Sequence, residues 1–181
     1  MKKLFVLIAI FIVPLSSYSI PSIDTNSPAH VWDKAKMALF SGNFSENTLR
    51  QYIDQDTESW FENLKEVGIS GCFNDTNKLS PIDKFIVLTL RASYTSKALT
   101  KLSIDRVIKE DFRDNFKGSQ QIQNAPLKNL IINGPYATGD LILDMIPYPI
   151  KIFFSKEESF WKINLKKTSN QFEKQLTMLP K

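Results

Sequence analysis

The chain has 181 residues, 43% of them apolar and 23% charged, with 6 Gly and 9 Pro. This length suits one domain, and the composition excludes collagen, low-complexity sequence and wholesale disorder. One Cys and one His exclude a Cys/His zinc cluster and an intrachain disulfide framework. Because Cys72 cannot pair within the chain, we expect it to be buried, with a disulfide between two copies as the alternative.

The first residues have the three-part pattern of a secretory signal peptide. Lys2 and Lys3 precede a wholly apolar run at positions 4–13, and Pro14 follows it. The run is about ten residues long, whereas a membrane-spanning helix needs roughly 20. No later apolar stretch in the sequence reaches that length, so we expect no transmembrane segment in the mature chain.

Small residues mark the expected cleavage point. Ser17 and Ser19 occupy the two positions that a signal peptidase reads, which predicts cleavage between Ser19 and Ile20. We therefore expect residues 1–19 to be a signal peptide and residues 20–181 to form one exported domain, in the periplasm or outside the cell. An uncleaved membrane anchor is the alternative.

Cleavage would also change the charge balance. The full chain has 23 basic and 19 acidic residues, and loss of Lys2 and Lys3 lowers its net charge from +4 to +2. This small excess is not typical of nucleic-acid-binding proteins, so we expect no nucleic-acid partner.

Helices are predicted for the first part of the mature chain. Ser27-Pro28 and Ser80-Pro81 each place an N-cap serine before a proline at the first helical position. Further helix starts are predicted at Ser45, Thr57 and Ser103, each followed by apolar residues at three- and four-residue spacing.

The later helices are expected to differ in burial. Residues 85–99 are nearly all apolar or small, so we expect them to form the most buried helix. The helix from Ser103 is expected to end at Gly118. Residues 119–126 have no apolar period and are predicted to be a loop.

An antiparallel sheet is predicted after residue 126. A strand is expected at 127–132, followed by a turn at 133–135. From Ala137 the apolar residues recur at every second position, which places Leu141 and Leu143 on the core face of the next strand.

The end of the chain continues this pattern. A strand is predicted at 150–155, a hairpin connection at 156–159, a last strand at 161–165 and a short tail helix at 171–178. The buried face of the last strand comprises Trp161, Ile163 and Leu165, and its wet face comprises Lys162, Asn164 and Lys166.

The order of these elements predicts the fold class. Helices followed by consecutive antiparallel strands indicate an α+β protein rather than the alternation of a parallel α/β fold. We expect N-terminal helices to pack on a curved antiparallel sheet.

A resemblance extends this expectation. The stretch from Ala137 to Leu165, which ends in Trp161-Lys162-Ile163-Asn164-Leu165, resembles the sheet of the nuclear transport factor 2-like superfamily, the cystatin-like α+β cones. The resemblance implies an exported bacterial member in which a bent sheet wraps on helices around a cone-shaped pocket. Members include isomerases, dehydratases, transport adaptors and lipid carriers, so it implies no single activity.

The sequence offers little for catalysis. His30 is the only histidine and lies in the first turn of a predicted helix, and no GxSxG nucleophile elbow occurs. Neither GxxxxGK nor GxGxxG is present, so we expect no nucleotide cofactor and predict no other cofactor. Asp54, Asp56 and Glu58 are interpreted as a solvated helix junction, with a calcium site as the alternative.

Two aspartates carry the enzyme hypothesis. Asp140 and Asp144 point to the same side of a predicted strand. If that side lines the cone, one of them could be a buried general base with a raised pKa. If it faces water, both are ordinary surface residues, which is the interpretation that we favour.

Aromatic side chains carry the binding hypothesis. Most of them are expected in the core, but a cone between the helix at residues 81–99 and the sheet at residues 137–165 would suit an apolar ligand if aromatic rings line it. The candidates are Trp60, Phe61, Tyr94, Tyr136 and Trp161.

Two classes of function follow. The first is an exported binding or accessory protein without catalytic activity, whose partner is an apolar small molecule, a lipid or another envelope protein. The second is a small pocket enzyme of the isomerase or dehydratase kind that uses a buried carboxylate. The first is favoured because the chain has almost no histidine.

Overall fold

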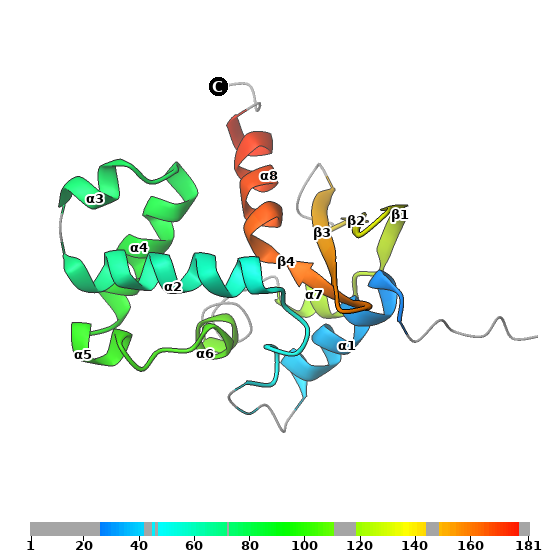
Figure 1. The fold of residues 1–181 in the computed structure, drawn as a ribbon, viewed down its shortest axis with the longest axis horizontal. Coiled ribbons are helices and arrows are strands. Elements are labelled where there is room, and N and C mark those ends of the chain that lie inside the picture. The colour runs from blue at the N-terminus through cyan, green and yellow to red at the C-terminus, as the bar shows by residue number, and fades with distance from the viewer. Residues whose placement is uncertain are drawn as a thin grey trace, which may run out of the picture.

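The computed structural model describes residues 26–41, 45, 47–71, 73–110, 119–143 and 149–177. Within these ranges the fold is α+β, as predicted (Figure 1). The helices are α1 (Pro28–Phe40), α2 (Gln55–Ser70), α3 (Phe73–Asn77), α4 (Pro81–Ser93), α5 (Ser96–Leu99), α6 (Ile104–Val107), α7 (Ser119–Asn124) and α8 (Leu165–Thr177). The strands are β1 (Leu127–Asn133), β2 (Tyr136–Leu141), β3 (Ile150–Glu157) and β4 (Phe160–Asn164). The predicted signal peptide with Ser19 and Ile20, Cys72 and Asp144 lie outside the described residues.

The four strands form an open antiparallel sheet in the order β1-β2-β3-β4. Tight turns join β1 to β2 and β3 to β4. Gly134 has a φ of 57° in the first turn, and Glu158 and Ser159 have φ of 47° and 84° in the second. The second turn has positive φ at both central residues, and the first has it at Gly134, its first central residue. Both patterns match the twist of a hairpin, so both predicted turns are confirmed.

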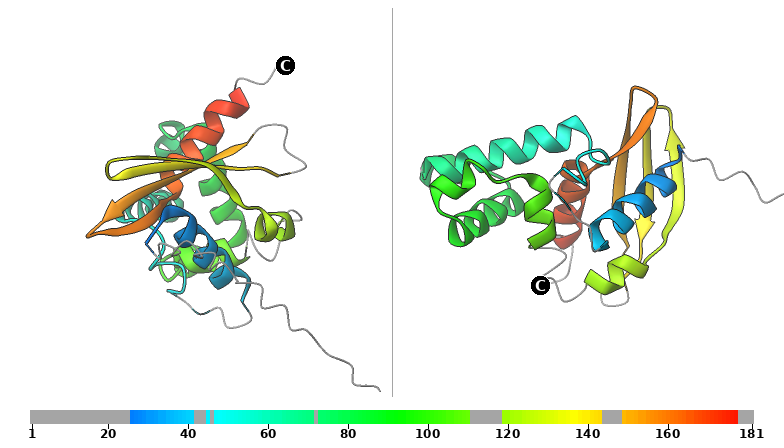
Figure 2. Two further views of the ribbon diagram at one scale, coloured as in Figure 1. Left: turned by 90° about the vertical axis from the view of Figure 1, so that its right-hand side faces the viewer. Right: turned by 90° about the horizontal axis from the view of Figure 1, so that it is seen from below.

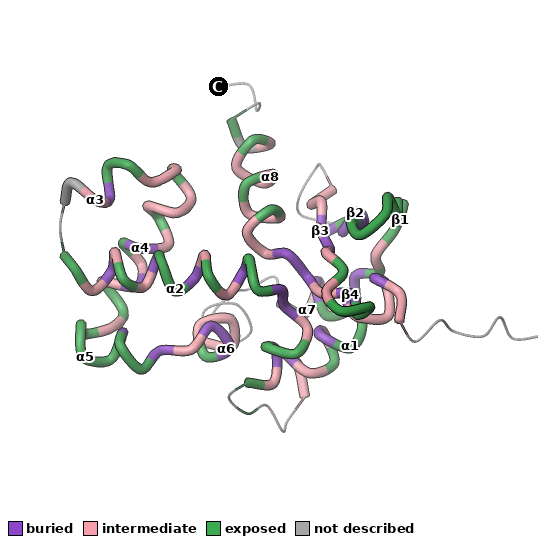
Figure 3. Tube along the Cα trace, viewed as in Figure 1, coloured by how far each residue is buried: buried purple, intermediate pink, exposed green. Residues whose placement is uncertain are grey.

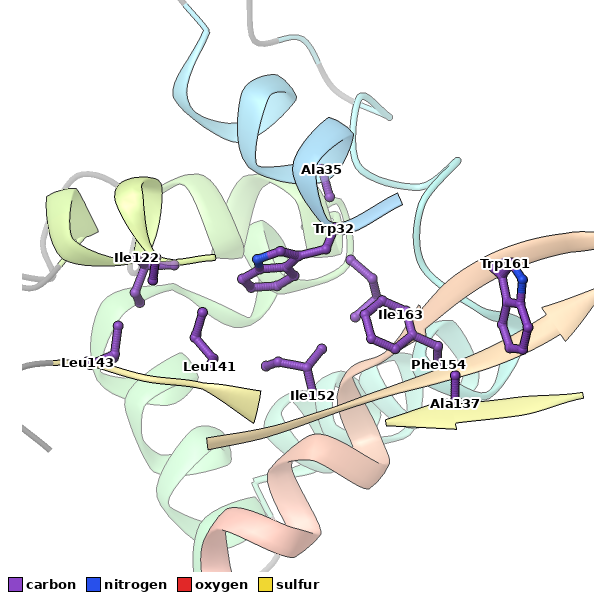
Figure 4. Close-up of a cluster of buried hydrophobic side chains, with 11 residues drawn as sticks. Trp32, Ala35, Ile122, Ala137, Leu141, Leu143, Ile152, Phe154, Trp161 and Ile163 are labelled. Atoms are coloured by element: carbon purple, nitrogen blue, oxygen red, sulfur yellow. The ribbon is translucent and has the colours of Figure 1, made fainter. Parts of the chain in front are cut away.

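The sheet and α1 enclose the first of two buried clusters (Figure 4). The alternation predicted from Ala137 is confirmed, because Ala137, Leu141 and Leu143 are all buried in this cluster. Trp161 is also buried, at 6% exposure, as predicted. A Cβ on Gly139 would lie 2.5 Å from the Cγ atom of Leu127, so the strand needs glycine there for β1 to pack closely.

One prediction failed beside the sheet. Residues 119–124 form the short helix α7 rather than a loop, and α7 brings Ile122 onto the same face of the sheet as α1. An element of six residues is too short for a period of 3.6 to be read from the sequence.

The predicted strand at 127–132 is confirmed as β1. It is an edge strand that leaves Ile131 and Ile132 exposed (Figure 3).

The last strand ends one residue earlier than predicted, and α8 begins at once. The side chain of Asn164 accepts a hydrogen bond from the backbone N–H of Lys167 at 2.7 Å, which caps the new helix. Asn164 is therefore buried rather than on a wet face. Leu165 starts α8 instead of ending a strand, and α8 packs on β3 (Figure 2).

Helices α2 to α6 surround a second buried cluster. It includes Phe61 from α2 and Leu90 from α4. The run predicted as one helix at 85–99 is divided, because α4 ends at Ser93 and Thr95 caps α5 through the backbone N–H of Ala98.

The prediction that this run is the most buried helix is wrong. On α4, Phe85 is 69% exposed and Leu88 is 48% exposed. The helix packs on α2 and α8, whereas the resemblance and the apolar run together placed it against the sheet. α1 and α7 lie over the sheet instead, so the cone between residues 81–99 and the sheet does not form.

Residues 47–52 form turns where a helix from Ser45 was predicted. The backbone of Ile163 in β4 donates to the carbonyl of Tyr52 at 2.7 Å and accepts from the N–H of Asp54 at 3.1 Å. These bonds form a bridge between Ile53 and Ile163, which attaches the end of the segment to β4.

Asp54 is buried at 1% exposure, so its interpretation as solvated is wrong. Its carboxylate accepts from the N–H of Thr57, which caps α2, and from the hydroxyl of Ser155 at 2.5 Å. The neighbouring Asp56 pairs with the ammonium of Lys166 at 2.9 Å, which lowers the pKa of Asp56. The acidic cluster therefore ties α2 to the sheet and α8.

No helix in the described part of the chain combines the length and the apolar character needed to cross a membrane.

Candidate functional site

The aromatic residues predicted to line one pocket lie in separate places. In the helical part, the indole N–H of Trp60 donates to the carboxylate of Asp83 at 2.9 Å, which joins α2 to α4. The hydroxyl of Tyr94 donates to Glu110 at 2.6 Å. Phe61 is packed in the second buried cluster. None of these three aromatic side chains comes from the sheet.

The other two predicted residues lie on opposite faces of the sheet. Trp161 packs in the first buried cluster, with the ammonium of Lys156 at 5.7 Å from the centre of its ring. Tyr136 is 54% exposed, and the ammonium of Lys167 lies 4.4 Å from its ring centre. The five aromatic candidates therefore do not form a common site.

Asp140 is buried on the sheet face opposite the core, at 6% exposure, so its favoured interpretation as an ordinary surface residue is wrong. Its carboxylate pairs with the ammonium of Lys151 and accepts from the side-chain amide of Asn129 at 3.0 Å. These two hydrogen bonds outweigh burial and hold the pKa of the Asp140 carboxyl below its ordinary value. The enzyme hypothesis requires a raised pKa, so it is wrong for Asp140. Asp144 lies outside the described residues.

A largely apolar cavity of about 250 Å³ lies between α1 and the core face of the sheet. Because several elements contribute to it, its wall combines residues from both ends of the chain. The described residues that line it are Trp32, Ala35, Lys36, Leu39, Leu49, Tyr52, Ile53, Ile108, Ile122, Leu141, Ile150, Ile152, Ile163, Leu165 and Thr168.

One wall of the cavity is a single face of α1. The N-cap of Ser27 fixes where this helix begins. Trp32, Ala35, Lys36 and Leu39 follow at the spacing of neighbours on one helix face. The helix start therefore determines that a lysine shares this face with three apolar side chains.

The opposite wall is the alternating face of the sheet. Leu141 and Ile150 are directly opposed in the β2–β3 register, and Ile152 follows on the same side of β3. Ile163 adds the contribution of β4, next to Phe154 in the register. These branched side chains make this wall wholly apolar.

Polar groups on the cavity wall are few. The hydroxyl of Thr168 is engaged, because it donates to the carbonyl of Asn164 at 2.8 Å and accepts from the N–H of Phe153 at 3.1 Å. The indole Nε1 of Trp32 is buried and has no hydrogen-bond partner within the described part of the chain. A buried donor without a partner costs about 1–3 kcal/mol.

The ammonium of Lys36 lies beside this indole. It is 5.8 Å from the centre of the Trp32 ring, donates to the carbonyl of Ala125 at 2.9 Å and lies 3.1 Å from the carboxylate of Asp33. The Lys36 side chain is only 12% exposed. Its ammonium is therefore held between α1 and the residue that follows α7.

A second hollow, of about 290 Å³, lies beside α2 and is polar. There Arg50 donates two hydrogen bonds to the carboxylate of Glu58, at 2.8 and 3.0 Å. Asp105 is fully buried, and its Oδ1 atom accepts from the backbone N–H of Leu49, whereas its Oδ2 atom has no hydrogen-bond partner within the described part of the chain. The charged lining makes this hollow less suited to an apolar ligand.

The described ranges contain no group of three or more His, Cys, Asp or Glu side chains that could hold a metal ion. His30 lies in the first turn of α1, where its backbone N–H donates to the Ser27 hydroxyl. Sequence reasoning identified Trp32 only as an apolar helix residue and missed Lys36. The signal that could have found both is a lysine four residues after a tryptophan on an otherwise apolar face.

No protein-family model, no curated protein and no solved structure matches this chain. The resemblance to the nuclear transport factor 2-like superfamily therefore stays a prediction.

Proposed function

We propose that the protein binds an apolar ligand in the cavity between α1 and the sheet. The observation that carries the proposal is the chemistry of the wall. Branched and aromatic side chains dominate it, and the surface that it presents is almost wholly apolar. Apolar walls of this kind favour an apolar occupant.

A ligand that binds the folded chain in this pocket and not the unfolded chain would stabilise the fold by mass action. Its binding should therefore raise the unfolding temperature.

The experiment is a titration of the protein with dodecanol, followed by calorimetry and by thermal unfolding. We expect binding and a higher unfolding temperature. Ala35→Phe places a ring in the cavity and should abolish binding in a protein that still unfolds cooperatively. Met37→Phe is the matched control, because Met37 is 60% exposed on the same helix. Equal binding by both variants would contradict the proposed site.

The binding protein is further proposed to be exported. The support is the pattern of residues 1–19, with the small residue Ser19 before the expected cleavage point. Sequencing the N-terminus of the protein recovered from the periplasm or the medium should give Ile20 as the first residue. An intact N-terminus in the membrane fraction would contradict this part of the proposal.

The cavity supports binding better than catalysis. The carboxylate of Asp140 is ionised, paired with Lys151 and on the other face of the sheet, so it cannot act on a ligand in the cavity. The proposed function is accordingly that of a non-enzymatic binding protein.

A further inference from the structure

We propose that β1 is an interface, at which it pairs antiparallel with β1 of a second copy of this chain. The two sheets then join into one across a twofold axis. This inference goes beyond the proposed ligand binding and does not depend on it. It is carried by the open backbone of the edge strand, by its exposed apolar side chains and by the position of its one charge.

The sheet has two edge strands, and the described residues cover only one of them. At β4, the backbone of Ile163 bonds both Tyr52 and Asp54, so the chain covers this edge with its own segment. At the other edge, β1 pairs with β2 alone within the described part of the chain. An edge strand with unpaired N–H and C=O groups is a template for a further strand.

The register of the β1–β2 hairpin shows which backbone groups of β1 face the open edge. Asn133 and Tyr136 flank the two-residue turn, and Ile131 lies opposite Thr138. A two-residue turn is closed by a hydrogen-bonded pair, and such pairs alternate along an antiparallel ladder with residues whose N–H and C=O point away from the partner strand. Ile132 lies between these two pairs, so its N–H and C=O point to the open edge.

The side chains of β1 are exposed and apolar on both faces of the strand. Ile131 is 63% exposed and Ile132 is 56% exposed, and consecutive residues of a strand point to opposite faces. In Figure 3 most of β1 is coloured as exposed. Natural edge strands are commonly protected by lysine, proline or a bulge. Here Lys128 and a bulge protect the first half, whereas residues 130–132 are Leu-Ile-Ile.

A second copy of β1 fits this edge in its side chains and in its charge. In an antiparallel pair centred on Ile131 and Ile132, each copy offers apolar side chains to both faces, where the other copy exposes its own. Lys128 is the one charged residue of β1. The pairing places it opposite the turn at Gly134 of the other copy, so the two lysines are kept apart.

The size of the contact predicts a reversible dimer. β1 has seven residues, and a single pair of strands buries less than the about 1,200–2,000 Å² typical of stable complexes. Contacts below this size belong to weak and transient complexes. The two copies should therefore separate on dilution.

The experiment combines sedimentation velocity with hydrogen exchange on the purified protein, between about 5 and 500 µM. We expect a shift from monomer to dimer as the concentration rises. The amide of Ile132 should exchange about fivefold more slowly at the highest concentration, because a proton bonded across the interface exchanges only from the monomer. A monomer at every concentration would overturn the proposal. A dimer in which this amide exchanges as fast as in the monomer would also overturn it.

Two matched variants test the position of the interface. Ile131→Lys and Phe160→Lys each place a charge at a strand residue that is 63% exposed, the first on β1 and the second on β4. Ile131→Lys brings two like charges together near the axis and should weaken the dimer at least about tenfold. Phe160→Lys should change it by less than about twofold. Equal weakening by both variants would show unspecific apolar association and overturn the assignment to β1. The exchange of Ile132 in the unaltered protein decides the inference even where a variant fails to fold.

Discussion

The sheet region (α1, α7 and β1–β4) and the helical region (α2–α6) bury their apolar residues in different ways. Each contains a 13-residue helix that begins with Ser-Pro, α1 in the first and α4 in the second. On α1, Trp32 and Leu39 are buried toward the sheet. On α4, Leu90 is buried, whereas Phe85 and Leu88 of the same apolar run are exposed.

The difference shows that a helix start and an apolar run do not determine burial. A sheet presents a broad surface, and α1 can cover it with one whole face (Figure 4). The neighbours of α4 are the narrower ridges of α2 and α8, which cover only part of its surface. Ala35, a small residue of α1 at this interface, leaves part of the space that becomes the cavity in the sheet region.

The two regions are nevertheless joined. Leu165 is packed against both buried clusters, and Asp54 caps α2 while it bonds Ser155 of β3. These contacts predict that the regions unfold together rather than in sequence.

The largest effect is expected in the sheet core. Phe154 is 1% exposed, and Phe154→Ala should lower the free energy of unfolding by about 3–5 kcal/mol, the range for aromatic residues replaced by alanine in cores. Urea denaturation measures this loss. Phe160→Ala is the control at a 63% exposed position on the neighbouring strand and should change stability by less than about 0.5 kcal/mol. Similar losses for both would contradict the register of β3 and β4.

The helical core should respond almost as strongly. Leu90→Ala is expected to cost about 2–5 kcal/mol, whereas Leu88→Ala on the exposed side of α4 should cost less than about 0.5 kcal/mol. Because the regions are joined, Leu90→Ala should move the same single transition that Phe154→Ala moves. Two separate transitions in either variant would show that the regions unfold independently.

The connection between the regions can be broken at Asp54. Asp54→Ala removes the cap of α2 and the acceptor for the Ser155 hydroxyl, and should cost about 2–4 kcal/mol. Asp54→Asn keeps an acceptor for the cap and should cost less. Hydrogen exchange of α2 and β3 amides checks whether protection falls on both sides of the contact. A loss confined to α2 would show that the Ser155 bond does not couple the two regions.

The smallest effect concerns the outer face of the sheet. The pKa of Asp140 is lower in the folded chain than in the unfolded chain, mainly because Lys151 and Asn129 donate to its carboxylate. The ionised Asp140 carboxylate therefore stabilises the folded chain at pH values above about 4, which is its pKa in the unfolded chain. This stabilisation is lost as the pH falls through the lower pKa of Asp140 in the folded chain.

Asp140→Asn should lower the free energy of unfolding by about 1 kcal/mol at neutral pH, the upper value for such a pair near the surface. The difference from the unaltered protein should shrink as the pH falls below about 4. Denaturation at a series of pH values measures it. A difference that grows toward low pH would contradict the lowered pKa.

The sequence by itself determined the local features of this protein. Ser27 and Ser80 cap helices that begin at Pro28 and Pro81 as predicted, because a cap and its helix turn lie within three residues of one another. The alternation from Ala137 also predicted the core face of β2 correctly, since neighbours on a strand point to opposite sides. Both signals are periodic or contiguous in the chain.

Only the tertiary structure decided which surfaces meet. Asp54 is buried by Ser155, 101 positions away, and Lys36 meets Ala125 across 89 positions, so no local spacing records either contact. The same reason explains the candidate site. An apolar period shows which face of a helix or strand leaves water. It does not show whether that face meets close-packed side chains, as at Phe154 of β3, or a cavity, as at Trp32 of α1.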